Sequence, residues 1–514
     1  MSAPPAAIEP LQGSARLVGT IGVSLATFMT VLDSSIANVS LPAIAGDMGV
    51  SPAQGTWVVT SFGVANAISV PLTGWLARRF GQVRLMVLSV LAFTLFSWMC
   101  GAAPSIETLI LARVLQGLAA GPLIPISQVL LLSSYPPARA GAAMAAWGMT
   151  VLVAPVVGPL LGGWITDNIA WPWIFYINVP VGLLSAAMTW SVYRRRESPH
   201  GQTPLDLAGL ALLVVWVGSL QLMVDQGKEL DWFESGEIIT LAVIAAVGFV
   251  FFLAWELTQA SPIVDLRLFT QRNFTLGTIA FSVSYGLFFG NVVLLPLWLQ
   301  QHMGYTAIWA GAVLAPVGVF AIMLSPWVGR HISRIEPRLL TTVSFLGYAL
   351  VLWLRSRFTV DTDPITILLP TVLQGLATAF YFIPLQAIIY SGLPPARLPA
   401  AGGLSTFARF VAGAVGTSVF TTLWERRASL HHARLTEIVD IGGPAALPAL
   451  QRLAEAGLTP TQTLGMVDRL IDQQAHTMAA TDVFLLSGWL YLLLLLPLWT
   501  TGPMLARPAR AVAD

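Results

Sequence analysis

The sequence is poor in charged residues and contains a single cysteine. Lys, Arg, Asp and Glu make up 10% of the 514 residues, whereas an ordinary soluble domain has about 25%. Cys100 alone can form neither an internal disulfide nor a thiolate metal cluster. A net charge of +1 gives no electrostatic basis for binding nucleic acid. P-loop and metal-ligand motifs are also missing from the sequence, which argues against ATP-driven transport and hydrolysis, and no cofactor is expected.

Hydrophobic residues dominate what is present. They make up 56% of the chain, and the mean hydropathy is +0.75. Apolar stretches long enough to cross a bilayer of about 30 Å recur from end to end. Because helices satisfy their own backbone hydrogen bonds in lipid, we predict an all-α integral membrane protein with fourteen spans. The spans lie near residues 17–38, 53–77, 83–103, 106–133, 140–166, 172–193, 206–225, 237–257, 273–300, 306–329, 338–356, 364–391, 401–424 and 482–503.

Two short motifs recur at one fixed distance and predict two equivalent halves. Residues 114–119 (VLQGLA) return at 372–377, and residues 136–139 (PPAR) return at 394–397, each 258 residues later. Such a repeat is expected of two parallel six-helix bundles with the same membrane orientation. The predicted units are an N-terminal bundle at 1–193, a cytoplasmic linker at 194–205, two inserted helices at 206–257 and a C-terminal bundle at 273–514.

The basic residues predict the orientation in the membrane. Most of the 26 lie on the side of the two termini, so both termini are expected in the cytoplasm. Arg355, at the outer end of the span predicted near 338–356, is counted with the short loops on the opposite side, where residues 425–481 form the only large soluble segment. Leucines at helical spacing there predict short amphipathic helices. These helices either cap the outer mouth or form a docking surface for a partner.

Two charged residues inside predicted spans are the candidates for proton coupling. Asp33 lies in the first span, where a carboxylate costs roughly 2.5 to 3.5 kcal/mol unless it is paired or titrates. Arg113 lies in the fourth span and needs a counter-charge, and Asp33 is the only acid well inside a span. Either Arg113 tunes the affinity of Asp33 for a proton, or the two form a static ion pair that orders the spans.

Glycines and prolines mark two further candidate elements. In the fifth span, small residues at a four-residue spacing allow another helix to approach closely, and prolines bend the helix axis. Between spans 2 and 3, glycines permit a tight turn, while arginines hold the topology or contact a helix end of the other half. The first element comprises Pro155, Gly158, Pro159, Gly162 and Gly163. The second, a cytoplasmic gate loop, comprises Gly74, Arg78, Arg79, Gly81 and Arg84.

Polar and aromatic residues on otherwise apolar spans are candidates for a substrate cavity. Buried amides need hydrogen-bond partners, so these residues face either a wet central cavity or a neighbouring helix. The candidates are Thr30, Asn38, Gln116, Gln128, Tyr285, Asn291, Trp298 and Gln374. His431 and His432 lack the spacing of metal ligands and are expected on the surface.

Four motifs together resemble those of EmrB-type multidrug efflux pumps, which are fourteen-span drug:proton antiporters of the major facilitator superfamily. They occur in the expected order along the chain. They are LDSSIANVSLP at 32–42, RVLQG at 113–117, GPLLGG at 158–163 and WPWIFYINVP at 171–180. The resemblance extends over essentially the whole chain, including residues 56–67 and 227–233.

The resemblance implies proton-driven export of hydrophobic, chemically diverse toxic compounds across the inner membrane of a Gram-negative bacterium. It further implies assembly with a periplasmic membrane-fusion adaptor and an outer-membrane channel. By position, Asp33 takes the proton and substrate role, Arg113 the proton-relay role, and residues 158–163 the antiporter motif.

One departure from the superfamily pattern concerns the gate loop. Arg78 stands where the superfamily normally has Asp, which puts the usual contact between an acid and a helix end in doubt.

Two alternative functions remain open. The first is a proton-coupled exporter dedicated to one endogenous metabolite or siderophore. The second is a transport-dead membrane sensor, although no added signalling domain is visible. An enzyme is not expected, because the sequence shows no nucleophile–base or metal constellation.

Overall fold

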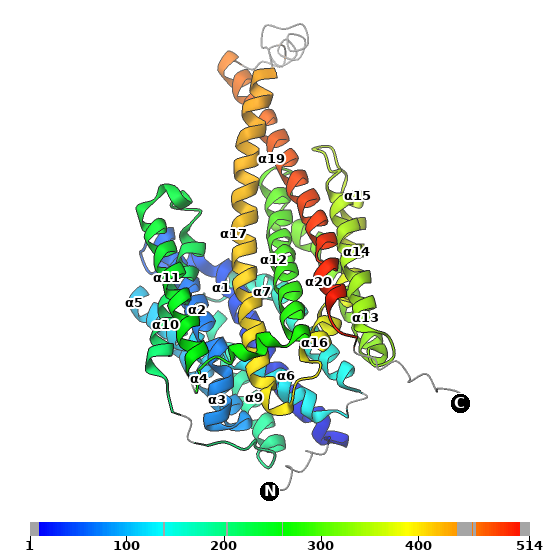
Figure 1. Cartoon of the computed structure of the whole chain (residues 1–514). Helices are drawn as coiled ribbons and strands as arrows, with labels where there is room; N and C mark the ends of the chain where they lie inside the picture. Colours follow the sequence, from blue (N-terminus) through cyan, green and yellow to red (C-terminus); the bar gives the residue numbers. More distant parts are fainter. Residues whose placement is uncertain are drawn as a thin grey trace, which may run out of the picture.

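The computed structural model describes residues 10–136, 139–201, 204–259, 261–438, 455 and 459–503. Within these residues every regular element is a helix (Figure 1). Thirteen helical segments are long and apolar enough to cross a membrane. Helix α7 (Ala140–Asn168) occupies the remaining predicted span. The prediction of an all-α membrane protein is confirmed.

The first half of the chain forms six spans, three of which are built from two or three consecutive helical pieces. Its helices are α1 (Gly13–Asp47), α2 (Pro52–Ser69), η1 (Val70–Leu72), α3 (Thr73–Phe80), α4 (Gln82–Gly101), α5 (Ile106–Ala120), α6 (Leu123–Ser134), α7, α8 (Trp173–Tyr176) and α9 (Asn178–Tyr193). The inserted helices are α10 (Leu207–Gln226) and α11 (Gly236–Thr258).

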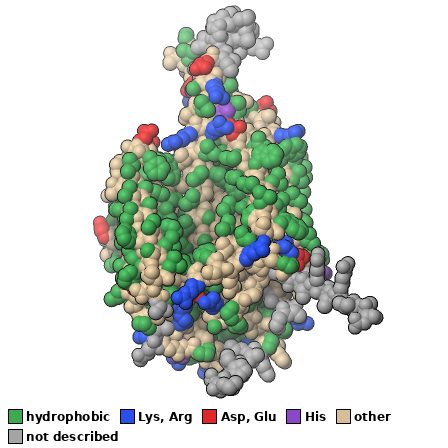
Figure 2. All heavy atoms as spheres, viewed as in Figure 1, with side chains coloured by type: hydrophobic (Ala, Val, Ile, Leu, Met, Phe, Trp, Pro, Cys, Tyr) green, Lys and Arg blue, Asp and Glu red, His purple; other side chains and the backbone are tan. Residues whose placement is uncertain are grey.

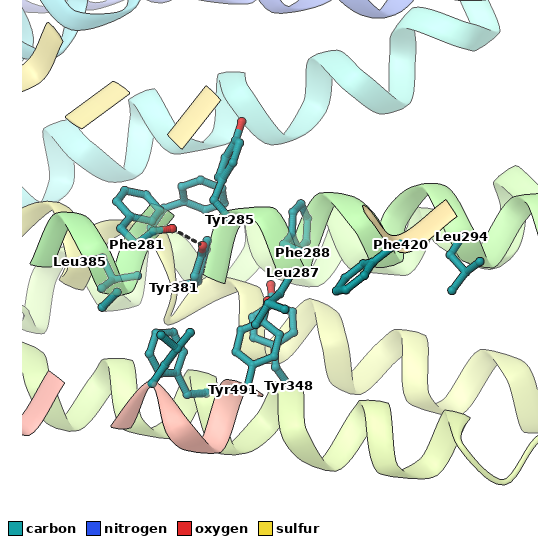
Figure 3. Close-up of a cluster of buried hydrophobic side chains, with 14 of the residues drawn as sticks. Phe281, Tyr285, Leu287, Phe288, Leu294, Tyr348, Tyr381, Leu385, Phe420 and Tyr491 are labelled. Carbon is teal, nitrogen blue, oxygen red and sulfur yellow. Dashed lines mark hydrogen bonds between the residues drawn. The ribbon is translucent and has the colours of Figure 1, made fainter. Parts of the chain in front are cut away.

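The second half contains the other six spans. Its helices are η4 (Leu266–Thr270), α12 (Arg272–Gln301), α13 (Ala307–His331), α14 (Pro337–Arg355), α15 (Pro364–Ala379), α16 (Phe382–Tyr390), η5 (Pro395–Arg397), α17 (Leu398–Ile438), α19 (Pro460–Leu493) and α20 (Leu495–Thr500). Aromatic side chains from α12, α14, α16 and α19 pack together in its core (Figure 3).

The sequence repeat corresponds to a repeated helix shape. In the first half, α5 ends at Ala120 and α6 resumes at Leu123, after Gly121 and Pro122. In the second half, α15 ends at Ala379 and α16 resumes at Phe382. The two breaks fall at equivalent places in the repeat, so both copies contain the same interrupted span.

The outer surface has the distribution expected of a membrane protein. Figure 2 shows a broad band of hydrophobic side chains around the middle of the molecule, with charged side chains gathered above and below it. Large apolar side chains of α11 such as Val250 and Phe251 are more than 60% exposed. An exposed apolar face along a whole helix is unfavourable in water, so we infer that lipid covers this face of α11.

Helices α17 and α19 extend far beyond the rest of the molecule (Figure 1). With 41 residues, α17 is about 61 Å long at 1.5 Å per residue, twice the thickness of a bilayer core. The expectation of short amphipathic helices after residue 425 is therefore wrong for the described part. Both long helices continue outward as a hairpin instead of folding over the mouth. Residues 439–454 and 456–458 lie outside the described residues.

Candidate functional site

Asp33 and Arg113 form an ion pair inside the first half. Asp33 lies on α1 and Arg113 on α5, and both side chains are 0% exposed. Arg113 Nη1 donates to Asp33 Oδ2 at 2.5 Å. Because buried charges require a partner in a low-dielectric interior, each residue accounts for the presence of the other.

Two amides complete the coordination of the carboxylate. Gln116 Nε2 and Asn178 Nδ2 each donate to Asp33 Oδ1 at 3.0 Å. Asn178 also donates to Ser97 Oγ, which in turn donates to the Phe175 carbonyl. The site therefore draws on α1, α4, α5 and α9, and it holds Asp33 in the geometry of an ionised carboxylate that accepts three hydrogen bonds.

Arg113 is held by a second set of contacts. Its Nε donates to the Val58 carbonyl at 2.9 Å, and its Nη1 also reaches Gln116 Oε1 at 2.8 Å. The guanidinium lies over the Phe62 ring, with Cζ 4.3 Å from the centroid. Its Nη2 has no hydrogen-bond partner among the described residues. This free donor can form a hydrogen bond to a further acceptor without breaking any of the hydrogen bonds that Arg113 already makes.

The arrangement suits a carboxylate whose protonation changes its partners. Ionised Asp33 offers acceptors only, which matches three donors. A proton on the carboxyl group would turn one acceptor into a donor and remove the charge that balances Arg113. Arg113, Gln116 and Asn178 would then have to rearrange. Of these partners, sequence reasoning missed Asn178 and Ser97 as site residues, although Asn178 stands out as an amide within an apolar run.

The eight cavity candidates do not meet in one cavity, although Asn291 and Gln374 line the same small hollow inside the second half. A cavity of about 530 Å³ opens between α1, α2 and the outer ends of α10 and α11, away from the ends where α1 begins and α20 stops. Asn38 alone of the eight candidates is among its lining residues. Asp225, Glu229 and Glu237 give this cavity an acidic wall, and Trp57 adds an aromatic one.

The other candidates make hydrogen bonds within or between helices. Thr30 donates to the backbone of its own helix, and Gln116 belongs to the ion-pair site. Asn291 and Trp298 donate to Ser487 and Thr477 on α19. For these residues the helix-to-helix alternative is the one that the structure shows.

Gln374 accepts a hydrogen bond from Arg355 at 2.7 Å. Arg355 was expected in an outer loop. That expectation is wrong, because Arg355 ends α14 and its side chain is 1% exposed inside the second half.

The last two cavity candidates also contact neighbouring side chains. Tyr285 lies on α12 with its ring beside that of Phe281 (Figure 3). Gln128 accepts from the Tyr390 hydroxyl at 2.5 Å, which joins the two halves.

The glycines of α7 pack against α1, the helix that carries Asp33. A Cβ on Gly162 would lie 2.7 Å from Ile36 Cγ1 and 3.1 Å from the Ile36 carbonyl oxygen, and one on Gly158 would meet Ser35. A Cβ on Gly163 would meet no described atom within 4 Å. The close approach predicted for this motif is therefore found, with α1 of the same half as partner. The side chains of Pro155 and Pro159 lie outside the described part.

The gate loop contacts both halves through its helices. Gly74 on α3 lies against Ala400 on α17, where a Cβ would come within 2.7 Å of Ala400 Cβ. Arg78 Nη2 donates to the Pro262 carbonyl at 3.5 Å. Gly81 has a φ of +84°, which favours glycine. Arg79 sits in the last turn of α3.

An acid from elsewhere in the chain meets the helix end beside the gate loop. Glu197 accepts hydrogen bonds from the backbone N–H groups of Val83 at 2.9 Å and Arg84 at 2.8 Å. A carboxylate at the first turn of α4 satisfies free N–H groups and complements the helix dipole. Glu197, which follows the sixth span, thus supplies the acid that is absent at the position of Arg78. Sequence reasoning gave no indication of it, since Glu197 lies 113 residues from Arg84.

The halves meet on the side where α1 begins. There Gly141 at the start of α7 faces Gly329 and Ile332 at the end of α13. The pairs Gly74–Ala400 and Gln128–Tyr390 lie on the same side. Close contacts of this kind leave no room for a substrate between the halves at that end.

A family comparison identifies the architecture. The model of the Major Facilitator Superfamily matches residues 23–417. The chain belongs to this superfamily. Solved structures support the fold: the proton:xylose symporter XylE aligns with a TM-score of 0.60 at 13% identity, covering 95% of this chain and 96% of that one. The human organic anion transporter MFSD10 aligns with a TM-score of 0.58 at 14% identity, covering 93% and 100%.

Curated relatives place the chain in a branch of the superfamily. It is 50% identical over 496 residues to the multidrug export protein EmrB of Escherichia coli K12, covering 96% of this chain and 97% of the relative. It is 47% identical over 494 residues to the fatty acid resistance protein FarB of Neisseria gonorrhoeae, with the same shares covered. The chain is accordingly a multidrug efflux transporter of the EmrB type, a membrane protein that acts on small molecules.

The contact between α7 and α1 yields a first prediction. Gly162→Leu forces a side chain into Ile36, one turn from Asp33, and overpacking of this kind costs about 1 to 3 kcal/mol. We expect the variant to lose drug resistance in cells and to unfold at a lower temperature. Gly163→Leu is the matched control, because a side chain there meets open space. Equal behaviour of the two variants would contradict the role of this helix contact.

Proposed function

We propose that this transporter is a drug:proton antiporter in which Asp33 carries the coupling proton. The observation that supports it is the fully buried pair of Asp33 and Arg113, with the carboxylate coordinated from α1, α5 and α9. A buried ion pair is seldom retained for stability alone, because desolvation offsets most of the Coulomb attraction. A titratable carboxylate inside a membrane span is by default a functional group.

The proposed cycle alternates between two charge states. With Asp33 ionised, Arg113 and the two amides hold α1, α5 and α9 together. Protonation from the outer side releases Arg113 and allows the helices to shift, and deprotonation toward the inner side restores the pair. A membrane potential supplies about 2.3 kcal/mol per charge per 100 mV, so one proton moved inward sustains a drug gradient of roughly fiftyfold.

The conformation fits the outward-facing stage of this cycle. The halves are in contact on the side of the termini, which the distribution of basic residues assigns to the cytoplasm. The cavity beside Asn38 opens on the other side, between the first half and the inserted helices. We place the transporter in the bacterial inner membrane with both termini cytoplasmic, so that drug leaves toward the periplasm.

The projecting hairpin supports the proposed assembly into a tripartite pump. Helices α17 and α19 extend beyond the body on the outer side (Figure 1). A rigid projection of this length offers a docking surface for a periplasmic adaptor, which in turn would lead to an outer-membrane channel. Because the hairpin does not fold back over the molecule, docking is favoured over the alternative of a cap.

Asp33→Asn tests the proton role. An amide cannot release a proton, so we expect the variant to reach the membrane but to lose drug export driven by a pH gradient in proteoliposomes. Asp33→Glu keeps a titratable group displaced by about one methylene, and partial activity is expected. Full export by Asp33→Asn at wild-type protein levels would remove Asp33 from the mechanism.

A double-mutant cycle separates stability from coupling. Arg113→Gln leaves a buried carboxylate without its cation, at a cost of about 3 to 5 kcal/mol. Adding Asp33→Asn removes the orphaned charge, so the double variant should recover much of its unfolding temperature. It should still fail to transport. Recovery of export together with stability would show that the pair is only structural.

The second candidate function is an exporter with a narrower substrate range, which transports amphiphilic carboxylates. The relative FarB, 47% identical, is named for fatty acid resistance. Arg409 on α17 is 3% exposed, and no carboxylate in the described ranges lies within 4.0 Å of it. Its guanidinium lies 4.5 Å from the Phe281 centroid and donates to Thr406. Its Nε also donates to the Ser405 carbonyl. A buried cation that these described contacts leave without a carboxylate would attract an anionic headgroup.

Arg409 also gives the experiment that distinguishes the two candidates. If Arg409 recognises carboxylates, Arg409→Gln should reduce export of a medium-chain fatty acid about tenfold while export of a cationic dye continues. Arg409→Lys, which keeps the charge, should retain most of the fatty acid export. Equal losses for both substrates in Arg409→Gln would favour a structural role for the guanidinium.

A further inference from the structure

Three metal-binding side chains meet where the outer end of α12 contacts α19. His302 follows the last residue of α12, and Asp472 and His476 lie one turn apart on α19. Asp472 Oδ2 lies 3.7 Å from His302 Nδ1, and its Oδ1 lies 3.2 Å from His476 Nδ1. One ligand atom from each residue falls within 4.8 Å of the other two.

These separations, 3.2 and 3.7 Å to the two Asp472 oxygens and all within 4.8 Å, are close to those of a zinc site and require small side-chain movements to reach them. Tetrahedral zinc with bonds of about 2.0 to 2.1 Å places its ligand atoms about 3.3 to 3.4 Å apart. Two imidazoles and one carboxylate also form a donor set that zinc uses with a water as fourth ligand. We propose that His302, Asp472 and His476 bind a zinc ion at the base of the outer hairpin.

The two imidazoles already lie in contact at the site. The rings of His302 and His476 stack with centroids 3.9 Å apart and planes inclined by 15°, so the His476 ring has to turn before both lone pairs point at one ion. Two imidazolium cations would repel each other in this arrangement.

The surroundings fix the ligands without blocking access. Trp424 on α17 packs edge-on against both rings, and its Nε1 donates to the His476 carbonyl at 2.9 Å. Gln473 donates to the His302 carbonyl at 2.7 Å and holds the end of α12. The Asp472 side chain is 46% exposed, so an ion can enter from the outer side. On binding, His476 Nδ1 gives up its contact of 2.9 Å with the Asp472 carbonyl.

Two other histidines on the hairpin differ from this triad. His431 lies 2.8 Å from Asp482, but Arg427 already lies 3.2 Å from the same carboxylate and supplies its counter-charge. His432 pairs with Asp468 at 3.3 Å. Neither belongs to a described group of three ligands. His432→Ala is therefore a matched control, because it removes a histidine that faces an aspartate on the same hairpin.

The experiment measures metal binding directly. The full chain is purified in detergent without a polyhistidine tag, stripped with a chelator and titrated with zinc chloride in a calorimeter. Cobalt chloride serves as a coloured probe, since tetrahedral cobalt absorbs visible light far more strongly than hydrated cobalt. We expect one equivalent of each metal to bind, and zinc to raise the unfolding temperature, because the ion joins α12 to α19.

Three variants decide the outcome. His302→Ala and Asp472→Asn should each weaken zinc binding by about tenfold or more and abolish the cobalt spectrum, whereas His432→Ala should bind as the wild type does. Asp472→Asn is nearly isosteric and half-exposed, so it keeps the test valid if His302→Ala fails to fold. The proposal is overturned if the wild type binds no zinc, or if His432→Ala loses binding as strongly as the triad variants.

Discussion

The buried pair of Asp33 and Arg113 is the interaction on which the rest of the transporter depends. Neither charge tolerates a low-dielectric interior alone, so the helices that carry them must stay in contact as long as both are ionised. Asn178 and Ser97 extend the network to α9 and α4. In the proposed cycle, a single proton on Asp33 changes the balance of forces among these four helices of the first half.

The glycines of α7 link this pair to the interface between the halves. Gly158 and Gly162 bring α7 against α1 beside Asp33, while Gly141 at the other end of α7 faces α13. Helix α7 therefore contacts both the helix that carries Asp33 and the second half. Closely packed helix contacts of this kind have discrete arrangements and do not deform gradually, because small displacements create clashes. The glycines of the antiporter motif allow α7 to approach α1 closely.

Charges at the two ends of the molecule have separate tasks. On the side of the termini, Glu197 completes the first turn of α4 and compensates for the missing acid at the position of Arg78. On the opposite side, the long hairpin concentrates histidines and aspartates well outside the apolar band. Water screens these outer charges, so they tolerate exchange and suit binding. The buried Asp33–Arg113 pair cannot exchange its partners for water in the same way.

The sequence alone determined the spans and the identity of the ion pair. A bilayer accepts only long apolar helices, so hydropathy locates them, and Asp33 and Arg113 could be matched because each needed a counter-charge. Tertiary structure alone decided the rest. Asn178, Glu197 and the triad at His302 acquire their partners through helix rotation, which one-dimensional spacing does not encode across a hundred residues. The outward course of α17 and α19 likewise depends on packing between two helices that are separate in the sequence.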